Sequence, residues 1–215
     1  MSRNQRERRT TNLEAWVPKT RLGKMIQEGK ITSIEEVFLS GIKISEFQIV
    51  DSLIPDLQEE VINVNLVQKQ TDAGEQSRFK ALVAVGNRDG YIGLGSGKAR
   101  QVRNAIEKAA VNARLNIVPV KRGCGSWECG CGKPHSVPFE VEGECGGVRV
   151  VIVPGPRGLG LVSSEVAKVI LDLAGVKDLW MRSYGSTRTV PSYAFAIFDG
   201  LRKTYNLITQ VDWVK

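Results

Sequence analysis

The fold of this chain is indicated most clearly by one stretch, Val85-Gly-Asn-Arg-Asp-Gly-Tyr-Ile-Gly-Leu-Gly-Ser-Gly-Lys-Ala-Arg100. An apolar, β-rich run at 79–85 leads into it, and residues 86–90 supply Gly, Asn and Asp, which tolerate positive φ in a tight turn. We therefore expect a hairpin whose second strand is Tyr91–Leu94. From Lys98 to Arg114 apolar residues recur at helical spacing, which predicts a basic helix that begins at Lys98.

The segments on either side of this hairpin extend the pattern. Polar and apolar residues alternate at 61–67, as in a half-buried strand, and a polar loop is expected at Lys69–Arg78. The first unit is thus strand, strand, strand, helix. Upstream, residues 22–38 predict two short helices that are broken near Gly29.

A second unit is expected downstream. Its predicted elements are strands at 137–141, 148–153 and 179–184, a helix capped by Ser163 or Ser164 that ends at Gly175, and a last helix at 194–205, preceded by Pro191 and with Tyr205 on its inner face. The chain then divides into an N-terminal extension (1–55), the three-stranded unit (56–120), a Cys/Gly-rich connecting loop (121–136) and a C-terminal α/β domain (137–215).

The charge of the chain favours a polyanionic partner. The 215 residues carry a formal net charge of +7, with a pI near 9.3. No run approaches the roughly 18 apolar residues of a membrane span, and the arginine-rich N-terminus lacks the apolar core of a signal peptide. We therefore expect a cytoplasmic protein without a membrane partner.

The glycines of Gly93-Leu-Gly-Ser-Gly-Lys98 do not form a nucleotide site. A phosphate loop needs a glycine at the position of Ile92 and a hydroxyl at that of Ala99, and the dinucleotide fingerprint needs a glycine at that of Lys98. Glycine here lets the backbone approach a neighbour, and a helix start at Lys98 offers free amides to a phosphate.

The connecting loop holds Cys124, Cys129, Cys131 and His135 within twelve residues. Three thiols and an imidazole suit a tetrahedral structural zinc ion, although the spacing differs from the usual Cys-x2-Cys knuckle. In the other interpretation His135 shapes a basic turn on RNA, Cys145 is a small buried residue, and the remaining cysteines are unliganded thiols. Trp127 is expected to pack inside this loop.

The stretch quoted above resembles the signature of the small-subunit ribosomal protein S5 family, archaeal/eukaryotic type, and is most like the archaeal form. The similarity continues in the family's order through Gly132-Lys-Pro-His135, Val137-Pro138, Gly146-Gly147, Pro154-Gly-Pro-Arg-Gly-Leu-Gly160 and Gly185-Ser-Thr. It implies an α+β fold: a double-stranded-RNA-binding-like βββα domain followed by a βαβ-containing α/β sandwich, with an N-terminal helical extension. Eukaryotic members generally lack the three loop cysteines, so the shared function does not need them.

The resemblance also implies what the protein does. It predicts a non-enzymatic structural constituent of the small ribosomal subunit, located on cytoplasmic ribosomes, that binds rRNA and supports subunit assembly and translational accuracy. The expected partners are small-subunit rRNA, neighbouring small-subunit proteins and the messenger RNA entry region, with no small-molecule substrate. No cofactor is required, and structural zinc is the one metal that the residues suggest.

The predicted RNA-binding residues come from two sources. The family's RNA contacts carry over to Lys69, Arg78, Arg88, Lys98 and Arg100, and the distribution of positive charge adds Arg3, Arg6, Arg8, Arg9, Arg103, Lys133 and Arg157.

Two other function classes stay in view. A free-standing double-stranded-RNA-binding chaperone or regulator would use the same βββα unit. An enzyme of the α/β fold, such as a small-molecule kinase, would need a phosphate loop beside a catalytic carboxylate, whereas residues 154–160 hold prolines and an arginine.

Overall fold

The computed structural model describes residues 16–206, and these divide between Gln58 and Glu59 into two compact units. The first unit contains α2 (Arg21–Gln27), α3 (Ile34–Leu39) and α4 (Phe47–Leu53). Hydroxyls cap the first two helices: Thr20 accepts a hydrogen bond from the Gly23 amide and Ser33 from the Glu36 amide. The expected pair of short helices around Gly29 is confirmed, and α4 is an additional helix.

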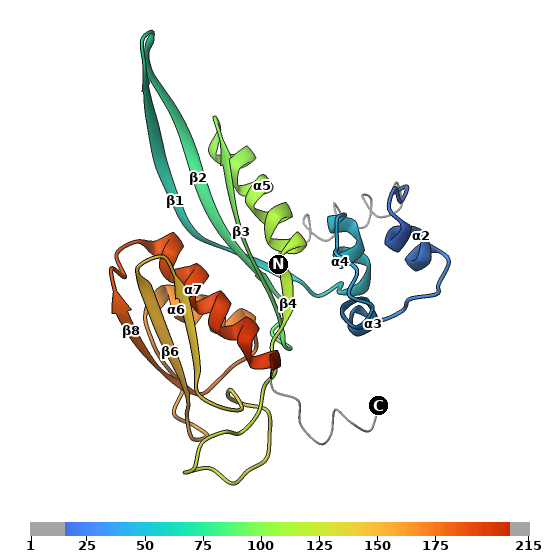
Figure 1. Cartoon of the computed structure of the whole chain (residues 1–215), viewed down its shortest axis with the longest axis vertical. Helices are drawn as coiled ribbons and strands as arrows, with labels where there is room; N and C mark the ends of the chain where they lie inside the picture. Colours follow the sequence, from blue (N-terminus) through green and yellow to red (C-terminus); the bar gives the residue numbers. More distant parts are fainter. Residues whose placement is uncertain (1–15, 207–215) are drawn as a thin grey trace. The chain divides into compact units, whose positions relative to one another are not determined.

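The second unit begins with a four-stranded sheet in the order β1-β2-β3-β4 (Figure 1). Its strands are β1 (Gln58–Thr71), β2 (Gly74–Gly86), β3 (Tyr91–Ala99) and β4 (Ile117–Pro119), and α5 (Val102–Leu115) follows β3. The predicted order of three strands and a helix is therefore confirmed. In Figure 1 the β1–β2 hairpin extends beyond the end of α5.

Two boundaries in this sheet differ from the prediction. The expected loop at 69–78 is almost entirely strand, because cross-strand bonds such as that from Gln68 Nε2 to Ser77 Oγ continue to a two-residue turn at 72–73. The helix starts at Val102 rather than Lys98, because β3 stays paired with β2 as far as Ala99. The amide of Lys98 consequently lies in a strand and not at a helix N-terminus.

The glycines of β3 allow unusually close packing of this strand on α5. A Cβ atom at Gly95 would lie 2.2 Å from the backbone nitrogen of Ala113, and one at Gly97 would lie 2.5 Å from the carbonyl oxygen of Ala105. Along α5, Ala105, Ala109 and Ala113 are buried at four-residue intervals, so one helix face presents only small side chains to the strand. Glycine in this stretch therefore serves backbone packing, as expected.

The second sheet has the order β5-β6-β8-β7. Its strands are β5 (Val141–Cys145), β6 (Val148–Pro154), β7 (Leu161–Val162) and β8 (Leu179–Gly185), and its helices are α6 (Glu165–Leu173) and α7 (Val190–Lys203), followed by a 3₁₀ turn (Thr204–Asn206). β7 and β8 are parallel and joined by α6, which confirms a βαβ unit. Ser164 caps α6, as predicted.

Two details of this region were predicted wrongly. Residues 137–140 are not a strand, because Pro138 has no amide to donate and Ser136 instead bridges to Gly123. Tyr205 is 55% exposed rather than inward, because α7 ends at Lys203 and the chain turns there.

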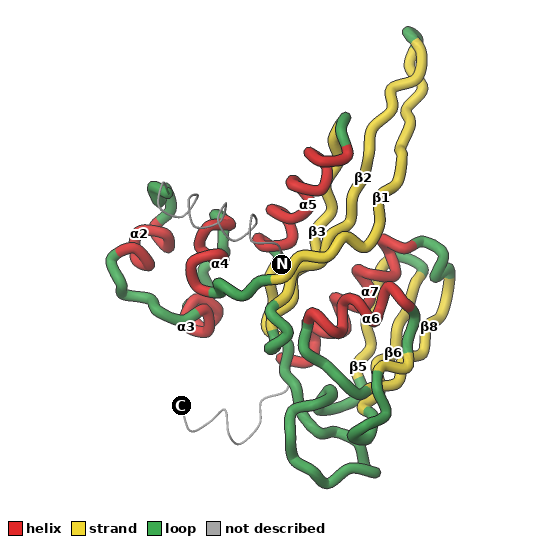
Figure 2. Tube along the Cα trace, turned by 180° about the vertical axis from the view of Figure 1, so that it is seen from behind, coloured by secondary structure: helices red, strands yellow, loops and turns green. Residues whose placement is uncertain are grey.

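The second unit is layered. α5 covers one face of the first sheet, and α6 and α7 lie between the other face and the second sheet (Figure 2). One apolar core joins Leu82 and Leu94 of the first sheet, Ile170 and Ile197 of the helices, and Ile152 of the second sheet. The α+β class is confirmed. No helix in the described part of the chain is long and apolar enough to span a bilayer.

Candidate RNA interface and cysteine loop

The hairpin of β1 and β2 carries two of the predicted RNA-binding residues. Lys69 lies on β1 and Arg78 on β2, and both side chains are exposed. Within residues 16–206, neither forms an ion pair with a carboxylate. The structure thus places both charges on an arm where they can meet phosphates.

A second basic group lies where β3 ends and α5 begins. Lys98 and Arg100 are exposed, and Arg103 is exposed but paired with Glu107 one turn later, at 3.1 Å. Beside them a groove is lined by Ser96, Gly97, Lys98, Glu107, Lys108, Val111 and Asn112. Lys108 was not among the predicted site residues, because charge on a helix gives no sign of which strand it will face.

Arg88 has a different environment from the other predicted residues. It occupies the β2–β3 turn with φ of 58°, its amide donates to the carbonyl of Leu173 at 2.9 Å, and its guanidinium pairs with Asp172 at 3.0 Å. Gly86 in the same turn has no room for a Cβ, which would lie 2.4 Å from the Leu173 oxygen. The β2–β3 turn therefore packs on the C-terminal end of α6, and Arg88 connects the first sheet to this helix through its bonds to Leu173 and Asp172.

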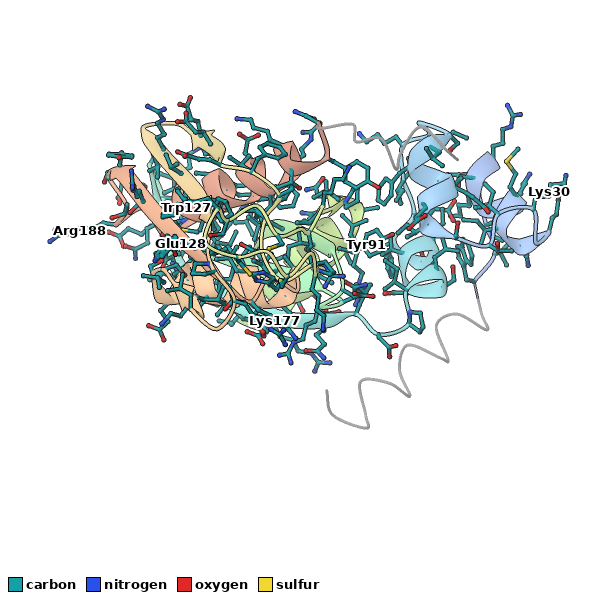
Figure 3. All side chains as sticks on the ribbon, turned by 90° about the horizontal axis from the view of Figure 1, so that it is seen from below. Lys30, Tyr91, Trp127, Glu128, Lys177 and Arg188 are labelled. Carbon is teal, nitrogen blue, oxygen red and sulfur yellow. The ribbon has the colours of Figure 1, made fainter. Side chains whose placement is uncertain are left out.

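The remaining predicted residues lie elsewhere. Arg3, Arg6, Arg8 and Arg9 fall outside the described residues. Lys133 and Arg157 are exposed on or next to the cysteine loop, residues 121–136, since the Arg157 amide donates to the sulfur of Cys129. Trp127 does not pack inside this loop as predicted but is 91% exposed, and Figure 3 shows it with Glu128 on the loop.

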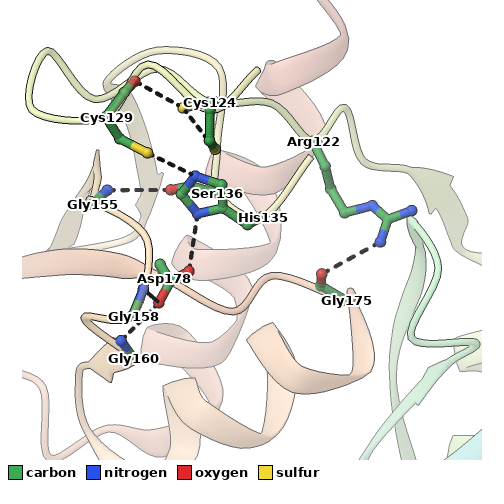
Figure 4. Close-up of polar contacts among 11 residues, drawn as sticks. Arg122, Cys124, Cys129, His135, Ser136, Gly155, Gly158, Gly160, Gly175 and Asp178 are labelled. Carbon is green, nitrogen blue, oxygen red and sulfur yellow. Dashed lines mark hydrogen bonds and ion pairs between the residues drawn. The ribbon is translucent and has the colours of Figure 1, made fainter. Parts of the chain in front are cut away.

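The cysteine loop brings its four candidate ligands together, and Figure 4 labels three of them, Cys124, Cys129 and His135. The Sγ atoms of Cys124, Cys129 and Cys131 and a ring nitrogen of His135 all lie within 4.8 Å of one another. Hydrogen bonds from the amides of Cys131 and Arg157 lower the pKa of the Cys129 thiol to about 6, whereas burial raises that of Cys124. None of the four cysteines of the chain forms a disulfide, and Cys145 lies apart from the cluster on β5.

Asp178 completes this site and was not predicted. Its Oδ2 lies 2.9 Å from Nδ1 of His135, and its Oδ1 accepts hydrogen bonds from the amides of Gly158 and Gly160. Asp178 is 43 residues from His135 in sequence, so no local spacing could have indicated the pair.

The sequence matches two family descriptions in order. Residues 57–121 match "Ribosomal protein S5, N-terminal domain", and residues 143–212 match "Ribosomal protein S5, C-terminal domain". Three similar proteins are each named small ribosomal subunit protein uS5. The protein of Aeropyrum pernix is 56% identical to this chain, over 99% of this chain and 97% of the relative. The protein of Ignicoccus hospitalis is 55% identical, over 96% of this chain and 98% of the relative. The protein of Pyrobaculum calidifontis is 57% identical, over 90% of this chain and 96% of the relative.

These matches agree with what the geometry offers: exposed basic surfaces on a layered α+β scaffold and a compact group of soft ligands. The resemblance found in the hairpin stretch is confirmed over nearly the whole chain. The chain therefore belongs to the ribosomal protein S5 family, which makes it a ribosomal protein and not an enzyme.

Proposed function

We propose that the protein is a structural constituent of the small ribosomal subunit and binds rRNA through two basic surfaces. The hairpin surface consists of Lys69 and Arg78, and the strand-end surface consists of Lys98, Arg100, Arg103 and Lys108. The relatives' name, small ribosomal subunit protein uS5, supports the assignment to that subunit.

One observation carries the RNA-binding part of the proposal. Several arginines have acidic partners, as Arg114 has Glu59 and Arg149 has Glu142, and within the strand-end surface Arg103 has Glu107. In contrast, no carboxylate in the described residues neutralises Lys98 or Arg100. Exposed cations without internal partners keep their full charge for phosphates, and each phosphate contact releases counterions.

The scaffold under the strand-end surface is well suited to positioning. β3 and α5 pack backbone against backbone through Gly95 and Ala113, so the charges stand on elements with little freedom to shift. Contacts of this kind orient a protein on a helical RNA backbone without reading bases. This supports a role in holding rRNA elements during subunit assembly.

The family resemblance extends the proposal to the neighbours of the protein. Other small-subunit proteins and the messenger RNA entry region would be its partners, and its contacts would support translational accuracy. Arg3, Arg6, Arg8 and Arg9 add a basic arm to the proposed RNA-binding residues, and Lys133 and Arg157 add charge beside the cysteine loop. The Arg88 side chain is half exposed although it pairs with Asp172, and its exposed part is proposed to contact RNA.

The RNA-binding part is tested with a double variant, Lys98→Ala with Arg100→Ala. Its affinity for small-subunit rRNA is measured by filter binding over a range of salt concentrations. We expect weaker binding and a salt slope, log K against log [salt], that is smaller by about 2, roughly one unit per lost phosphate contact.

The matched control removes two positive charges that have acidic partners, Arg149→Ala with Lys203→Ala. It should keep a slope close to that of the parent protein. Equal losses in both variants would contradict a localised surface. Separately, sucrose-gradient fractionation of lysate should place the protein in the small-subunit peak, and its recovery only with free RNA would favour the chaperone or regulator instead.

A further inference from the structure

The cysteine loop holds four ligand atoms at separations close to those of a tetrahedral metal site. Sγ of Cys131 lies 3.6 Å from Sγ of Cys124, and Sγ of Cys129 lies 3.7 Å from Nε2 of His135. With zinc–sulfur bonds of about 2.3 Å and zinc–nitrogen bonds of about 2.0 Å, neighbouring ligand atoms of a tetrahedral zinc ion lie about 3.5 to 3.8 Å apart. These two separations fall in this range, and all four ligand atoms lie within 4.8 Å of one another, so one ion fits between them after a small contraction of the cluster.

His135 is held in the orientation that a metal ligand requires. Its side chain and that of Asp178 are each only 8% exposed, and Oδ2 of Asp178 lies 2.9 Å from Nδ1, where a carboxylate accepts a hydrogen bond from the Nδ1–H group. This bond fixes the tautomer in which Nε2, the nitrogen facing Cys129, carries a lone pair. A carboxylate behind a histidine is the usual outer partner of a zinc-bound imidazole.

Asp178 is itself anchored by backbone. The amides of Gly158 and Gly160 donate to its Oδ1 at 3.1 and 2.8 Å, and its own amide lies 3.2 Å from the carbonyl oxygen of His135. The chain between β6 and β7 and the chain before β8 therefore both hold the cysteine loop at His135. The orientation of this ligand is set by the second sheet rather than by the loop alone.

The two ends of the loop are anchored by hydrogen bonds, from the Lys121 amide to Thr204 and from the Gly155 amide to Ser136, but the loop adds no side chain to the apolar core. The apolar core includes the flanking residues Val120 and Val137 but no residue of 121–136, and the regular pairing in the loop is one isolated bridge, Gly123 with Ser136. Short segments of this kind need a crosslink or a metal to keep one conformation, and binding of a structural zinc ion contributes directly to folding. Four protein ligands leave no position for a reactive water molecule, which distinguishes a structural site from a catalytic one.

From this geometry we propose that Cys124, Cys129, Cys131 and His135 bind one structural Zn²⁺ ion, with Asp178 as the residue that positions His135. Three thiolates and an imidazole are soft ligands that select zinc over magnesium or calcium. The ion closes the segment that connects the two sheets and fastens it to the second sheet. This proposal does not depend on rRNA binding.

The first test measures metal in the purified full-length protein without RNA. After anaerobic reconstitution with zinc and removal of the excess, elemental analysis should give about one equivalent, and less than about half an equivalent would overturn the proposal. Replacement by Co²⁺ should produce the intense visible bands of a tetrahedral ion and thiolate-to-cobalt charge transfer. The weak bands of an octahedral cobalt site would contradict it.

Matched cysteine variants test which residues bind the ion. Cys131→Ser should lower zinc affinity at least 100-fold in competition with a chromogenic chelator. Cys145→Ser removes the one cysteine outside the cluster and should leave both stoichiometry and affinity unchanged. Loss of zinc from Cys145→Ser, or its retention at full affinity by Cys131→Ser, would overturn the assignment.

A third variant separates positioning from binding. Asp178→Asn should keep one equivalent of metal and the tetrahedral cobalt spectrum, while its zinc affinity falls by about 10- to 100-fold, as for other outer partners of metal ligands. An unchanged affinity would remove Asp178 from the proposal. If Cys131→Ser does not fold, the parent protein is used in its place. The chelator should then release its zinc, and reloading with Co²⁺ should restore the tetrahedral spectrum; failure of either step would contradict the metal site.

Discussion

Two glycine-rich stretches of this protein are held in shape by different means. Strand β3, with Gly93, Gly95 and Gly97, lies in a sheet and against the backbone of α5. The cysteine loop, at 121–136, has no regular strand or helix and gathers four candidate metal ligands. Glycine content alone therefore says little about order, because the same residue serves close packing in one stretch and a tight loop in the other.

The space around individual glycines makes the difference explicit. A Cβ at Gly95 would meet backbone at 2.2 Å, whereas one at Gly130, between two candidate ligands, would meet nothing within 4 Å. Gly125, earlier in the loop, is packed as tightly as Gly95, because its Cβ would lie 2.2 Å from the carbonyl oxygen of Pro138. Gly132 has φ of 63°, so its use is conformational rather than steric. We infer that β3 depends on backbone packing, and that the open part of the loop around Gly130 and Gly132 depends on its side-chain ligands.

The largest expected effect comes from adding one methyl group to the packed strand. Gly95→Ala forces the new Cβ against the backbone atoms of Ala113 and Ala109, which cannot move independently of α5. We expect the free energy of unfolding to fall by about 3 kcal/mol in chemical denaturation, the upper range for overpacking. Gly130→Ala is the control and should change it by less than about 0.5 kcal/mol. Similar losses in both variants would remove the distinction.

Metal removal should destabilise the cysteine loop and leave the packing of β3 on α5 unchanged. With free zinc about 100-fold above its dissociation constant, binding stabilises the folded protein by about 2.7 kcal/mol, and a chelator removes this contribution. The measurement is thermal unfolding in buffered zinc and in chelator, together with limited proteolysis at Glu128, which is exposed in the loop. Cleavage after Glu128 should accelerate in chelator. An identical cleavage rate in both buffers would show that the loop orders itself without metal.

A smaller loss of stability is expected when Asp178, which holds His135 of the cysteine loop, is replaced. Asp178→Ala leaves the buried Nδ1 of His135 without its acceptor, and also the half-buried amide of Gly160 and the exposed amide of Gly158. Unsatisfied buried donors cost about 2 kcal/mol in the free energy of unfolding. Denaturation in chelator isolates this cost from metal binding. If Asp178→Ala is as stable as the parent protein in chelator, water has replaced the carboxylate as the hydrogen-bond acceptor.

The smallest effect should come from the turn that seats the first sheet on α6. Arg88 and Asp172 are both about half exposed, so Arg88→Ala should lower the free energy of unfolding by less than about 1 kcal/mol, as for other surface ion pairs. The backbone bond from the Arg88 amide to Leu173 persists in the variant. A double-mutant cycle with Asp172→Ala measures the pair. A coupling of several kcal/mol would show that side chains, not backbone, hold this glycine-rich turn.

Much of the fold was accessible from sequence because it depends on local patterns. Alternation and helical periodicity gave the order of the longer strands and helices in both sheets, and Ser164 and Gly175 marked the ends of α6, whereas the short strands β4 and β7 were not predicted. The four candidate ligands were also predictable as a group, because twelve residues of glycine-rich chain can bring them together. The sequence by itself thus determined the order of the longer elements of the second unit, the family and the donor set of the loop.

The tertiary structure decided features that depend on partners distant in the chain. The hairpin arm is longer than predicted because pairing across β1 and β2 overrides the polar character of residues 69–78. Arg88 faces α6, and Asp178 orients His135 across 43 residues. Helix α5 begins at Val102 because β2 keeps β3 extended. In each case a hydrogen bond or ion pair between residues far apart in sequence outweighs the local conformational preference of the segment. The periodicity of a sequence does not indicate which distant residue provides that bond.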